Sequence, residues 1–517
     1  MSKSNASGRS ADSQESVEAS NQTSSSRREF LSGAAVLAGA TAAQALGRSS
    51  AEEKGSAEEA LLAELSRPNG RAIVIRDATV LSMDPQVGDF ERADILIQGK
   101  KIVSVGPNLQ APGTALTLNA AGMIVMPGFV DTHHHQYEAI LRSTLADGVI
   151  VATASQSAPK VNYVSLIQQT FTPVYSPEDA RIAEMLSSLS QINAGVTTTV
   201  DTSQVQLTPE HTEGCIAGLK ESGHRAVFAY WPSPKEDEAA LAATLNRLRK
   251  RHFSSDDQPL TLGAHLKINV GQWKVARNLG VPIVSHIVGA SFGDLEVVAR
   301  ENLMGPDNEY VHCTFVSPPL WSRIADTGGK VSIAPAIEMQ MQHGLPPLQE
   351  AIDHSVRPSL SVDVECSMSA DLFTVMRSAF TLQRALANER IIKGEPNAPA
   401  LLTCRGVLEL ATVNGARVAH LDSKIGSITP GKEADLIFLA TDRINTVPLN
   451  NVPGAIVTLM DTSNVEHVLI AGKLMKWRGQ LVGVDVKRLR QQAQSACDGL
   501  FARAKYKRDL FGPCCQG

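Results

Sequence analysis

Three consecutive histidines follow a short apolar run, in the stretch Met126-Pro-Gly-Phe-Val-Asp-Thr-His133-His134-His135. The flanking residues are typical of a β-strand, and side chains on a strand alternate between its two faces. His133 and His135 should therefore point to one side of the strand, and His134 to the other. Two imidazoles on one face, at the end of a buried strand, make half of a metal site.

Further candidate ligands stand at the ends of later strand-like segments. His286 ends the segment 282–286, His312 lies in 310–315, and Asp363 ends 359–363. Three imidazoles and a carboxylate are a normal ligand set for zinc or another first-row divalent ion. In a parallel barrel the carboxyl ends of the strands meet at one rim, where the catalytic groups also lie. The sequence therefore predicts one site built from residues that are far apart in the chain.

The order of the elements predicts the scaffold that positions these residues. From 127 to 420, strand-like segments alternate with helical stretches, which indicates parallel βα units. Helical periodicity is clear at 177–194 and 372–389. Eight strands are expected, at 129–133, 196–201, 225–230, 260–264, 282–286, 310–315, 330–334 and 359–363. The predicted fold class is thus α/β, with a (β/α)8 TIM-type barrel at 127–420.

Short strands separated by turns occupy both flanks of this barrel. The pattern covers 71–126 and returns at 421–484, with strands expected at 435–440, 455–459 and 465–470. Each flank is too short to bury a good core alone, and chain termini often lie close together. We therefore expect one small β-sandwich domain formed by both flanks, followed by a C-terminal helix and tail at 485–517.

The first residues resemble a targeting segment. Residues 1–45 have a long polar start, the pair Arg27-Arg28, a small apolar run and the small-x-small site Ala43-Gln44-Ala45. This order is typical of a twin-arginine signal peptide. We expect residues 46–70 to be a linker. The apolar run is too short and too rich in Ala and Gly to span a bilayer convincingly. We expect export of a folded protein to the periplasm or the medium, without stable membrane association afterwards.

Composition limits the classes of partner. Apolar residues make up 43% of the 517 residues and charged residues 20%, which is typical of a soluble globular enzyme. The formal charge of −5 gives no electrostatic reason to expect nucleic acid. The seven cysteines lack metal-ligand spacing, so we expect no disulfide framework. The sequence assigns no role to the pair Cys514-Cys515. We expect a small-molecule substrate and leave a homo-oligomer open.

The residues described above resemble the amidohydrolase superfamily, in its branch of cytosine-deaminase-like and triazine-hydrolase-like enzymes. The likeness lies in the motif Pro-Gly-Phe-Val-Asp-x-His-x-His at 127–135 and in the segments 141–147, 194–198 and 426–437. It covers nearly all of the chain after the signal segment.

The resemblance implies one divalent metal ion, zinc or alternatively iron, held by His133, His135, His286 and Asp363. Such an ion lowers the pKa of a bound water from about 15.7 toward about 7. Asp363 would accept the proton of the attacking water. His312 would orient the attacked group or the metal-bound water, and would hydrogen-bond the developing oxyanion or the leaving group.

One position departs from the family pattern. Related deaminases carry a glutamate three residues after the strand-five histidine, where this chain has Gly289. Glu338, after the seventh strand, and Glu365, two residues past Asp363, are candidate replacements for this proton shuttle. Glu338 is preferred, because a loop residue there can face a substrate without crowding the metal.

The predicted function is hydrolysis of non-peptide C–N bonds, with deamination of a heterocyclic amidine ahead of hydrolysis of a cyclic amide or lactam. Gly289 leaves room for a hydrolytic dehalogenase or a lyase on the same scaffold. A hypothesis from a different functional class is that the chain is an exported, non-catalytic protein that binds metal or a small molecule. The intact set of candidate metal ligands argues against this non-catalytic hypothesis.

Overall fold

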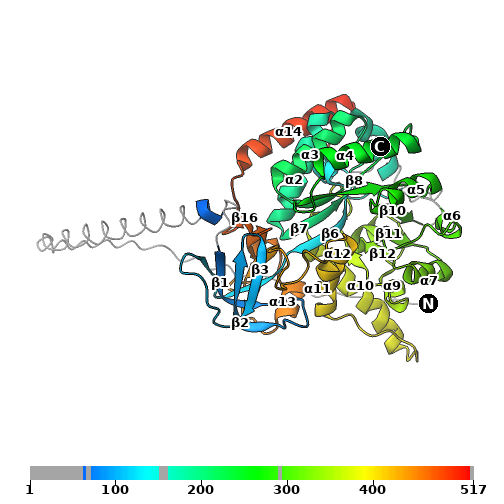
Figure 1. Ribbon diagram of the computed structural model, residues 1–517. Helices are drawn as coiled ribbons and strands as arrows, with labels where there is room; N and C mark the ends of the chain where they lie inside the picture. Colours follow the sequence, from blue (N-terminus) through cyan, green and yellow to red (C-terminus); the bar gives the residue numbers. More distant parts are fainter. Residues whose placement is uncertain (1–61, 66–71, 151–160, 289–293, 513–517) are drawn as a thin grey trace, which may run out of the picture. The chain divides into compact units, whose positions relative to one another are not determined.

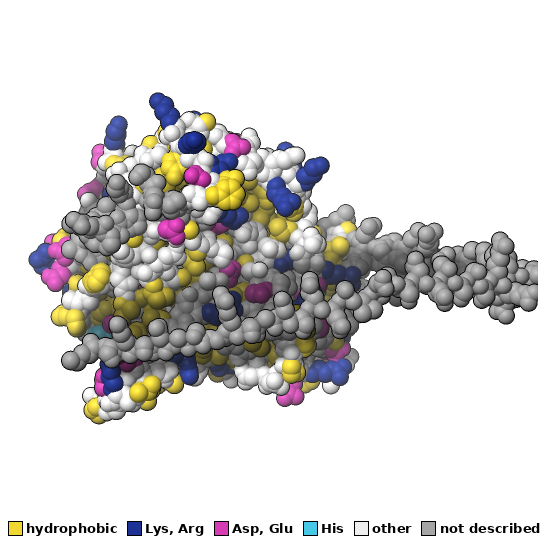
Figure 2. All heavy atoms as spheres, turned by 180° about the vertical axis from the view of Figure 1, so that it is seen from behind, with side chains coloured by type: hydrophobic (Ala, Val, Ile, Leu, Met, Phe, Trp, Pro, Cys, Tyr) yellow, Lys and Arg dark blue, Asp and Glu magenta, His cyan; other side chains and the backbone are white. Residues whose placement is uncertain are grey.

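The computed structural model describes residues 62–65, 72–150, 161–288 and 294–512 (Figure 1). The expectations for residues 1–45, Gly289 and Cys514-Cys515 lie outside these residues. None of the helices within them combines the length and the apolar character needed to cross a membrane. The face shown in Figure 2 carries Lys and Arg side chains scattered among Asp and Glu side chains.

Eight parallel strands of the described chain form one sheet, in which each strand neighbours the next in sequence. These strands are β6 Phe129–His134, β7 Val196–Asp201, β8 Arg225–Tyr230, β9 Leu260–His265, β10 Ile283–Val288, β11 Asn308–Thr314, β12 Lys330–Ile333 and β13 Ser359–Leu360. All eight predicted strands are present, and the predicted α/β barrel class is confirmed.

The barrel closes between its first and last strands. The backbone N–H of Asp363 donates to the carbonyl of His133 at 2.9 Å, and the N–H of His135 donates to the carbonyl of Asp363 at 2.8 Å. The Asp131 carboxylate adds to this seam by accepting from the Val362 N–H at 3.1 Å. The seam therefore joins two segments that carry candidate ligands.

Helices follow the strands and lie around the barrel (Figure 1). They are α2 Pro177–Asn193, α3 Pro209–Ser222, α4 Glu238–His252, α5 Val270–Asn278, α6 Leu295–Arg300, α7 Pro318–Asp326, α8 Pro335–Gln340, α9 Leu348–Asp353, α10 Leu372–Ile392, α11 Cys404–Ala411, α12 Val413–Val418 and α14 Val486–Arg503. The start of α2 shows why such segments become helical. Ser176 and Asp179 form a reciprocal capping box there, and Pro177 occupies the first turn.

Short helical segments add to these. They are η1 Gln136–Leu141, η2 Val164–Phe171, which has π geometry, η3 Thr172–Val174 and η5 Thr462–Asn464. The first three lie between β6 and α2, on the chain that leads away from the three histidines.

The two flanks of the barrel share one nine-stranded sheet in the described residues. Its strands are β1 Ala72–Val80, β2 Phe90–Gln98, β3 Lys101–Gly106, β4 Leu116–Asn119, β5 Met123–Pro127, β14 Leu436–Ala440, β15 Val465–Ile470, β16 Lys473–Trp477 and β17 Gln480–Leu481. β14 pairs antiparallel with β5, which joins the second flank to the first.

A buried ion cluster connects the barrel to this sheet. Arg225, the first residue of β8, is 1% exposed. Its guanidinium donates to Asp435 and to Glu433, each at 2.7 Å. Because each buried charge has a partner, the cluster avoids the large cost of an isolated buried ion.

The strand expected at 455–459 is wrong, because this segment belongs to the helix α13 Val452–Thr458. The side chain of Asn451 accepts from the Gly454 N–H at 2.8 Å, and Pro453 occupies the first turn. Both features favour a helix start. The apolar residues themselves are compatible with a strand or a helix, so the helix cap at Asn451 determines that the segment is helical.

Candidate metal centre

Residues from four parts of the barrel rim converge on one point. His133, His286, His312 and Asp363 each offer a ligand atom, and these atoms lie within 4.8 Å of one another. The Nε2 of His133 lies 3.1 Å from Asp363 Oδ1 and 3.1 Å from His286 Nε2. The Nε2 of His312 lies 3.7 Å from Asp363 Oδ2. Imidazole nitrogens and a carboxylate oxygen at such spacing fit a divalent first-row metal ion.

His135 lies beside this group. Its Nε2 is 3.5 Å from Asp363 Oδ1, and its ring meets the His133 ring edge-on at 4.7 Å. The structure thus brings all five predicted residues together. The tightest set of four contains His312, whereas the resemblance implied His135 as the fourth ligand.

The ring nitrogens that face away from this point have partners of their own. His133 Nδ1 lies 3.1 Å from Thr202 Oγ1, and His135 Nδ1 lies 2.9 Å from the Thr202 carbonyl. His286 Nδ1 lies 2.8 Å from His265 Nε2. Such outer partners hold a metal-binding histidine in one tautomer, with the lone pair of the other nitrogen free for the ion.

Glu338 lies behind His312 and does not face the cavity mouth, which is where the sequence predicted it. It sits in the first turn of α8 and folds back so that its Oε1 accepts from the Ala334 N–H at 2.9 Å. The same oxygen lies 3.1 Å from His312 Nδ1. Glu338 can therefore act on the reaction only through His312.

Glu365 also points away from the centre. It is 1% exposed, receives a bond from Arg142 Nε at 2.6 Å and lies 3.2 Å from His134 Nε2. Glu365 would share a face with Asp363 only if the strand continued, but β13 ends at Leu360, and Asp363 has a φ of 75° that turns the chain.

Protonation at the centre follows from burial and from the neighbouring charges. Burial, with a contribution from His133, lowers the pKa of His135 to about 3. Burial also lowers the pKa of His286 well below its usual value. Burial alone would raise the pKa of Asp363, but the imidazoles of His312 and His133 hold it well below its usual range. Neutral imidazoles beside an ionised carboxylate are the forms that bind a metal ion.

His312 differs from these histidines. Burial disfavours its charged form, but the Asp363 and Glu338 carboxylates raise its pKa above the usual value. Its backbone is also unusual, with a φ of 71° in the left-handed region. Non-glycine residues in this region store strain that is common at functional sites.

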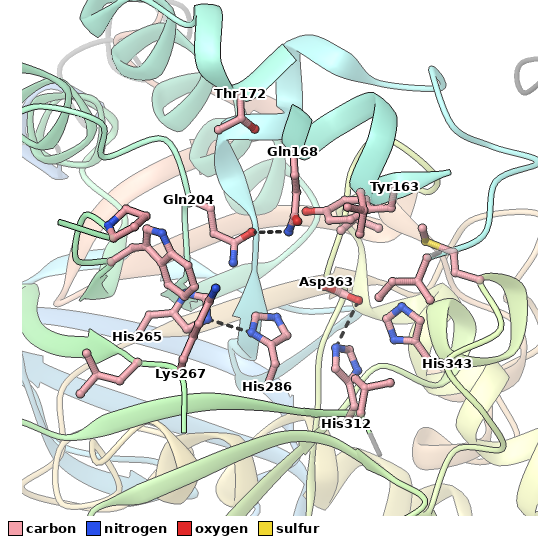
Figure 3. A pocket seen from close by; sticks show the side chains of 18 of the residues that line it. Tyr163, Gln168, Thr172, Gln204, His265, Lys267, His286, His312, His343 and Asp363 are labelled. Atoms are coloured by element: carbon pink, nitrogen blue, oxygen red, sulfur yellow. Dashed lines mark hydrogen bonds and ion pairs between the residues drawn. The ribbon is translucent and has the colours of Figure 1, made fainter. Parts of the chain in front are cut away.

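A cavity of about 670 Å³ opens above the centre (Figure 3). This size suits a small-molecule ligand. Polar lining residues include Tyr163, Gln168, Gln204, Lys267 and His343, and apolar ones include Trp231, Met341 and Val364. The Tyr163 hydroxyl donates to Glu138 at 2.7 Å, which fixes one side of the opening. Asp363 is the one carboxylic acid among the described lining residues.

Several of these residues were not predicted from the sequence. His265 ends β9, but the expected strand stopped one residue earlier, so the strand-end signal was available and missed. Thr202 directly follows β7, and a polar residue at the end of a strand is likewise a candidate site residue. His343 and Trp231 lie on loops and have no sequence signal that sets them apart.

Comparisons with known proteins agree with this geometry. The model of the amidohydrolase family matches residues 275–475. This match covers less than half of the chain, and over that segment the chain is similar to the family.

Relatives share most of the chain. A 5'-deoxyadenosine deaminase from Methanosarcina mazei is 25% identical over 455 residues, which span 83% of this chain and 99% of that protein. Among solved structures, a zinc-bound adenosine deaminase from Xanthomonas campestris aligns with a TM-score of 0.70 and 21% identity, over 83% of this chain and 98% of the other. A zinc-complexed atrazine chlorohydrolase from Arthrobacter aurescens TC1 aligns with a TM-score of 0.71 and 19% identity, over 82% and 100%. The two solved structures share the fold of this chain.

Proposed function

We propose that this protein is an amidohydrolase that removes an amino group from a heterocyclic substrate by metal-dependent hydrolysis, with zinc as the ion. The observation that carries the proposal is the convergence of His133, His286, His312 and Asp363 at the base of the cavity. The relative from Methanosarcina mazei, a deaminase by name, supports the choice of a C–N bond as the bond that is broken.

Each residue at the centre has a chemical task. We assign His133, His135, His286 and Asp363 to the ion, with His312 adjacent to it. A bound divalent ion supplies hydroxide at neutral pH and polarises the attacked group. Asp363, ionised at neutral pH, accepts a proton from the attacking water and returns it to the departing amine. His312, with its raised pKa, presents an N–H to the atom on which charge develops.

Ammonia release across a panel of heterocycles tests the proposal. Purified protein loaded with zinc would be incubated with adenosine, 5'-deoxyadenosine, cytosine and an amino-substituted triazine. We expect ammonia from at least one member, and none after treatment with a chelator. Full metal loading without ammonia from any member would contradict the deaminase proposal.

A second candidate is hydrolytic release of halide. A halide leaves without a proton, and the described cavity lining offers no acid besides Asp363 to deliver one. The panel should therefore include a chlorinated triazine. Chloride release without ammonia release would favour this second reaction.

We also propose that the protein is exported through the twin-arginine route, on the basis of Arg27-Arg28 and the apolar run that follows. Replacing both arginines with lysine should retain the precursor in the cytoplasm. Unchanged export of that variant would contradict the assignment.

A further inference from the structure

The loop after α8 carries a histidine that the metal centre does not use. His343 lines the cavity and is 3% exposed. Within the described residues, neither of its ring nitrogens has a hydrogen-bond partner. Buried polar atoms in folded proteins are almost always satisfied, so an unpartnered imidazole facing a cavity points to a ligand that completes it.

The position of His343 relates it to the reacting centre. Its ring meets the His312 ring edge-on, with 4.7 Å between centroids and an angle of 86°. Figure 3 shows His343 beside His312, on the side of the cavity away from His265 and Lys267. A substrate atom held by His343 would therefore lie next to the atom that His312 and Asp363 address.

The backbone holds this side chain in place. Gln342 has a φ of 59° and Gly344 a φ of 125°, so left-handed residues stand on both sides of His343. A Cβ at Gly344 would come within 2.8 Å of the Phe315 ring. The His343 N–H donates to the Glu338 carbonyl at 3.1 Å. This short turn thus aims His343 into the cavity, and backbone strain of this kind clusters at functional sites.

His343 acts as a neutral ring. Burial, with a contribution from His312, lowers its pKa to about 3. A neutral imidazole carries one N–H donor and one acceptor nitrogen. It can therefore form directional hydrogen bonds to a ligand without bringing a charge into the cavity.

The proposed reaction needs a donor at this place. When oxygen adds to the ring carbon that bears the amino group, an electron pair of the C=N bond moves onto the adjacent ring nitrogen. A fixed N–H aimed at that nitrogen stabilises the charge as it develops. We propose that His343 donates a hydrogen bond to the ring nitrogen next to the reacting carbon of the substrate. This inference rests on the proposed function and names the part of the heterocycle that the cavity recognises.

Binding of two inert rings tests the inference. Purine and 1-deazapurine differ by the one nitrogen next to the reacting carbon, and neither carries a leaving group. Their dissociation constants would be measured by titration calorimetry on the zinc-loaded protein, with zinc content and thermal melting recorded for every variant. We expect the wild type to bind purine about tenfold tighter, because loss of the nitrogen leaves the buried N–H unpaired. In His343→Phe and in His343→Leu the ratio should fall to about one.

Met341→Ala is the matched control, because Met341 lines the same cavity and offers no hydrogen bond to the ring. This variant should weaken the binding of purine and of 1-deazapurine by the same factor, so that the ratio of the two dissociation constants stays that of the wild type. Equal or undetectable binding of the two rings by the wild type, or a tenfold ratio that persists in either His343 variant, would overturn the inference. Ammonia release by the wild type is judged separately, so an active deaminase that does not distinguish the rings would refute the role of His343 alone.

Discussion

The end of strand β6 and the residue after it carry histidines on two opposite sides, under opposite conditions. His133 and His135 point to the cavity side, where their Nε2 atoms lie 3.1 and 3.5 Å from Asp363 Oδ1. His134 points to the other side, where its ring lies 2.7 Å from Asp131 and 3.2 Å from Glu365. All three rings are almost fully buried. The pKa of His135 is lowered to about 3, whereas that of His134 is raised to about 10.

This difference shows that partners, and not burial, decide what a buried histidine does. Burial disfavours the charged ring on both faces. On the opposite side of the strand, the carboxylates of Asp131 and Glu365 outweigh burial and keep His134 as a structural cation. On the cavity face, His133, His135 and His286 lie close to the Asp363 carboxylate and their lowered pKa values keep them neutral, which leaves nitrogen lone pairs for an ion. Two isosteric changes, Asp363→Asn and Glu365→Gln, separate the two faces.

The largest effect is expected from Asp363→Asn. This variant removes the carboxylate on which the cavity-side histidines converge, and with it the acceptor for the proton of water. We expect turnover to fall by about 10⁴-fold or more, while the unfolding midpoint of the metal-free protein changes little. Steady-state kinetics and chemical denaturation measure the two quantities. Turnover within tenfold of the wild type would remove Asp363 from the reaction.

Glu365→Gln should act on stability instead. Glu365 shares its buried charge with His134 and Arg142, and breaking a buried pair costs about 3–5 kcal/mol. We expect the free energy of unfolding to fall by about that amount, while the folded fraction keeps its zinc. Denaturant titration gives the first value and metal analysis of the folded fraction gives the second. Loss of the metal with unchanged stability would reverse the assignment of the two faces.

The pH dependence of stability should carry the signature of His134. Its folded pKa of about 10 lies above the unfolded value of about 6.5, so its contribution is complete below about pH 6.5 and is lost as the pH rises through about 10. Over this window the zinc-loaded wild type should lose stability relative to His134→Gln, by at most about 1.4 kcal/mol per pH unit. Parallel pH curves for the two proteins would show that His134 carries no charge.

The smallest effect is expected from Glu338→Gln. The Glu338 carboxylate raises the pKa of His312 and orients its ring, but it does not line the cavity. Turnover should fall by about 10- to 100-fold with full metal content, and the alkaline limb of the rate profile should move to lower pH because His312 loses its proton earlier. An unshifted profile would mean that Glu338 does not act through His312.

The sequence predicted the barrel and its rim well, because both follow from local periodicity. Strands β7 and β8 begin and end at the expected residues. The alternation of the three histidines follows from strand geometry alone. The grouping of His286, His312 and Asp363 follows from the rule that parallel strands end at one rim.

The directions of Glu338 and Glu365 could not be predicted in this way. Glu338 bends back because it caps the first turn of its own helix, and Glu365 points away from the metal centre because the backbone at Asp363 is left-handed. His343 depends on a turn with left-handed residues on both sides. In each case the side chain is placed by backbone torsions that sequence periodicity does not encode.

We expect a metal ion on the side of the β6 end that carries His133 and His135, and none on the side that carries His134. The most direct test is the metal content of purified wild type, His133→Asn and Glu365→Gln, by mass spectrometry after gel filtration. We predict about one zinc ion per chain in the wild type and in folded Glu365→Gln, and nearly none in folded His133→Asn. Equal metal content in His133→Asn and the wild type, or a wild type that binds no divalent ion, would contradict the account.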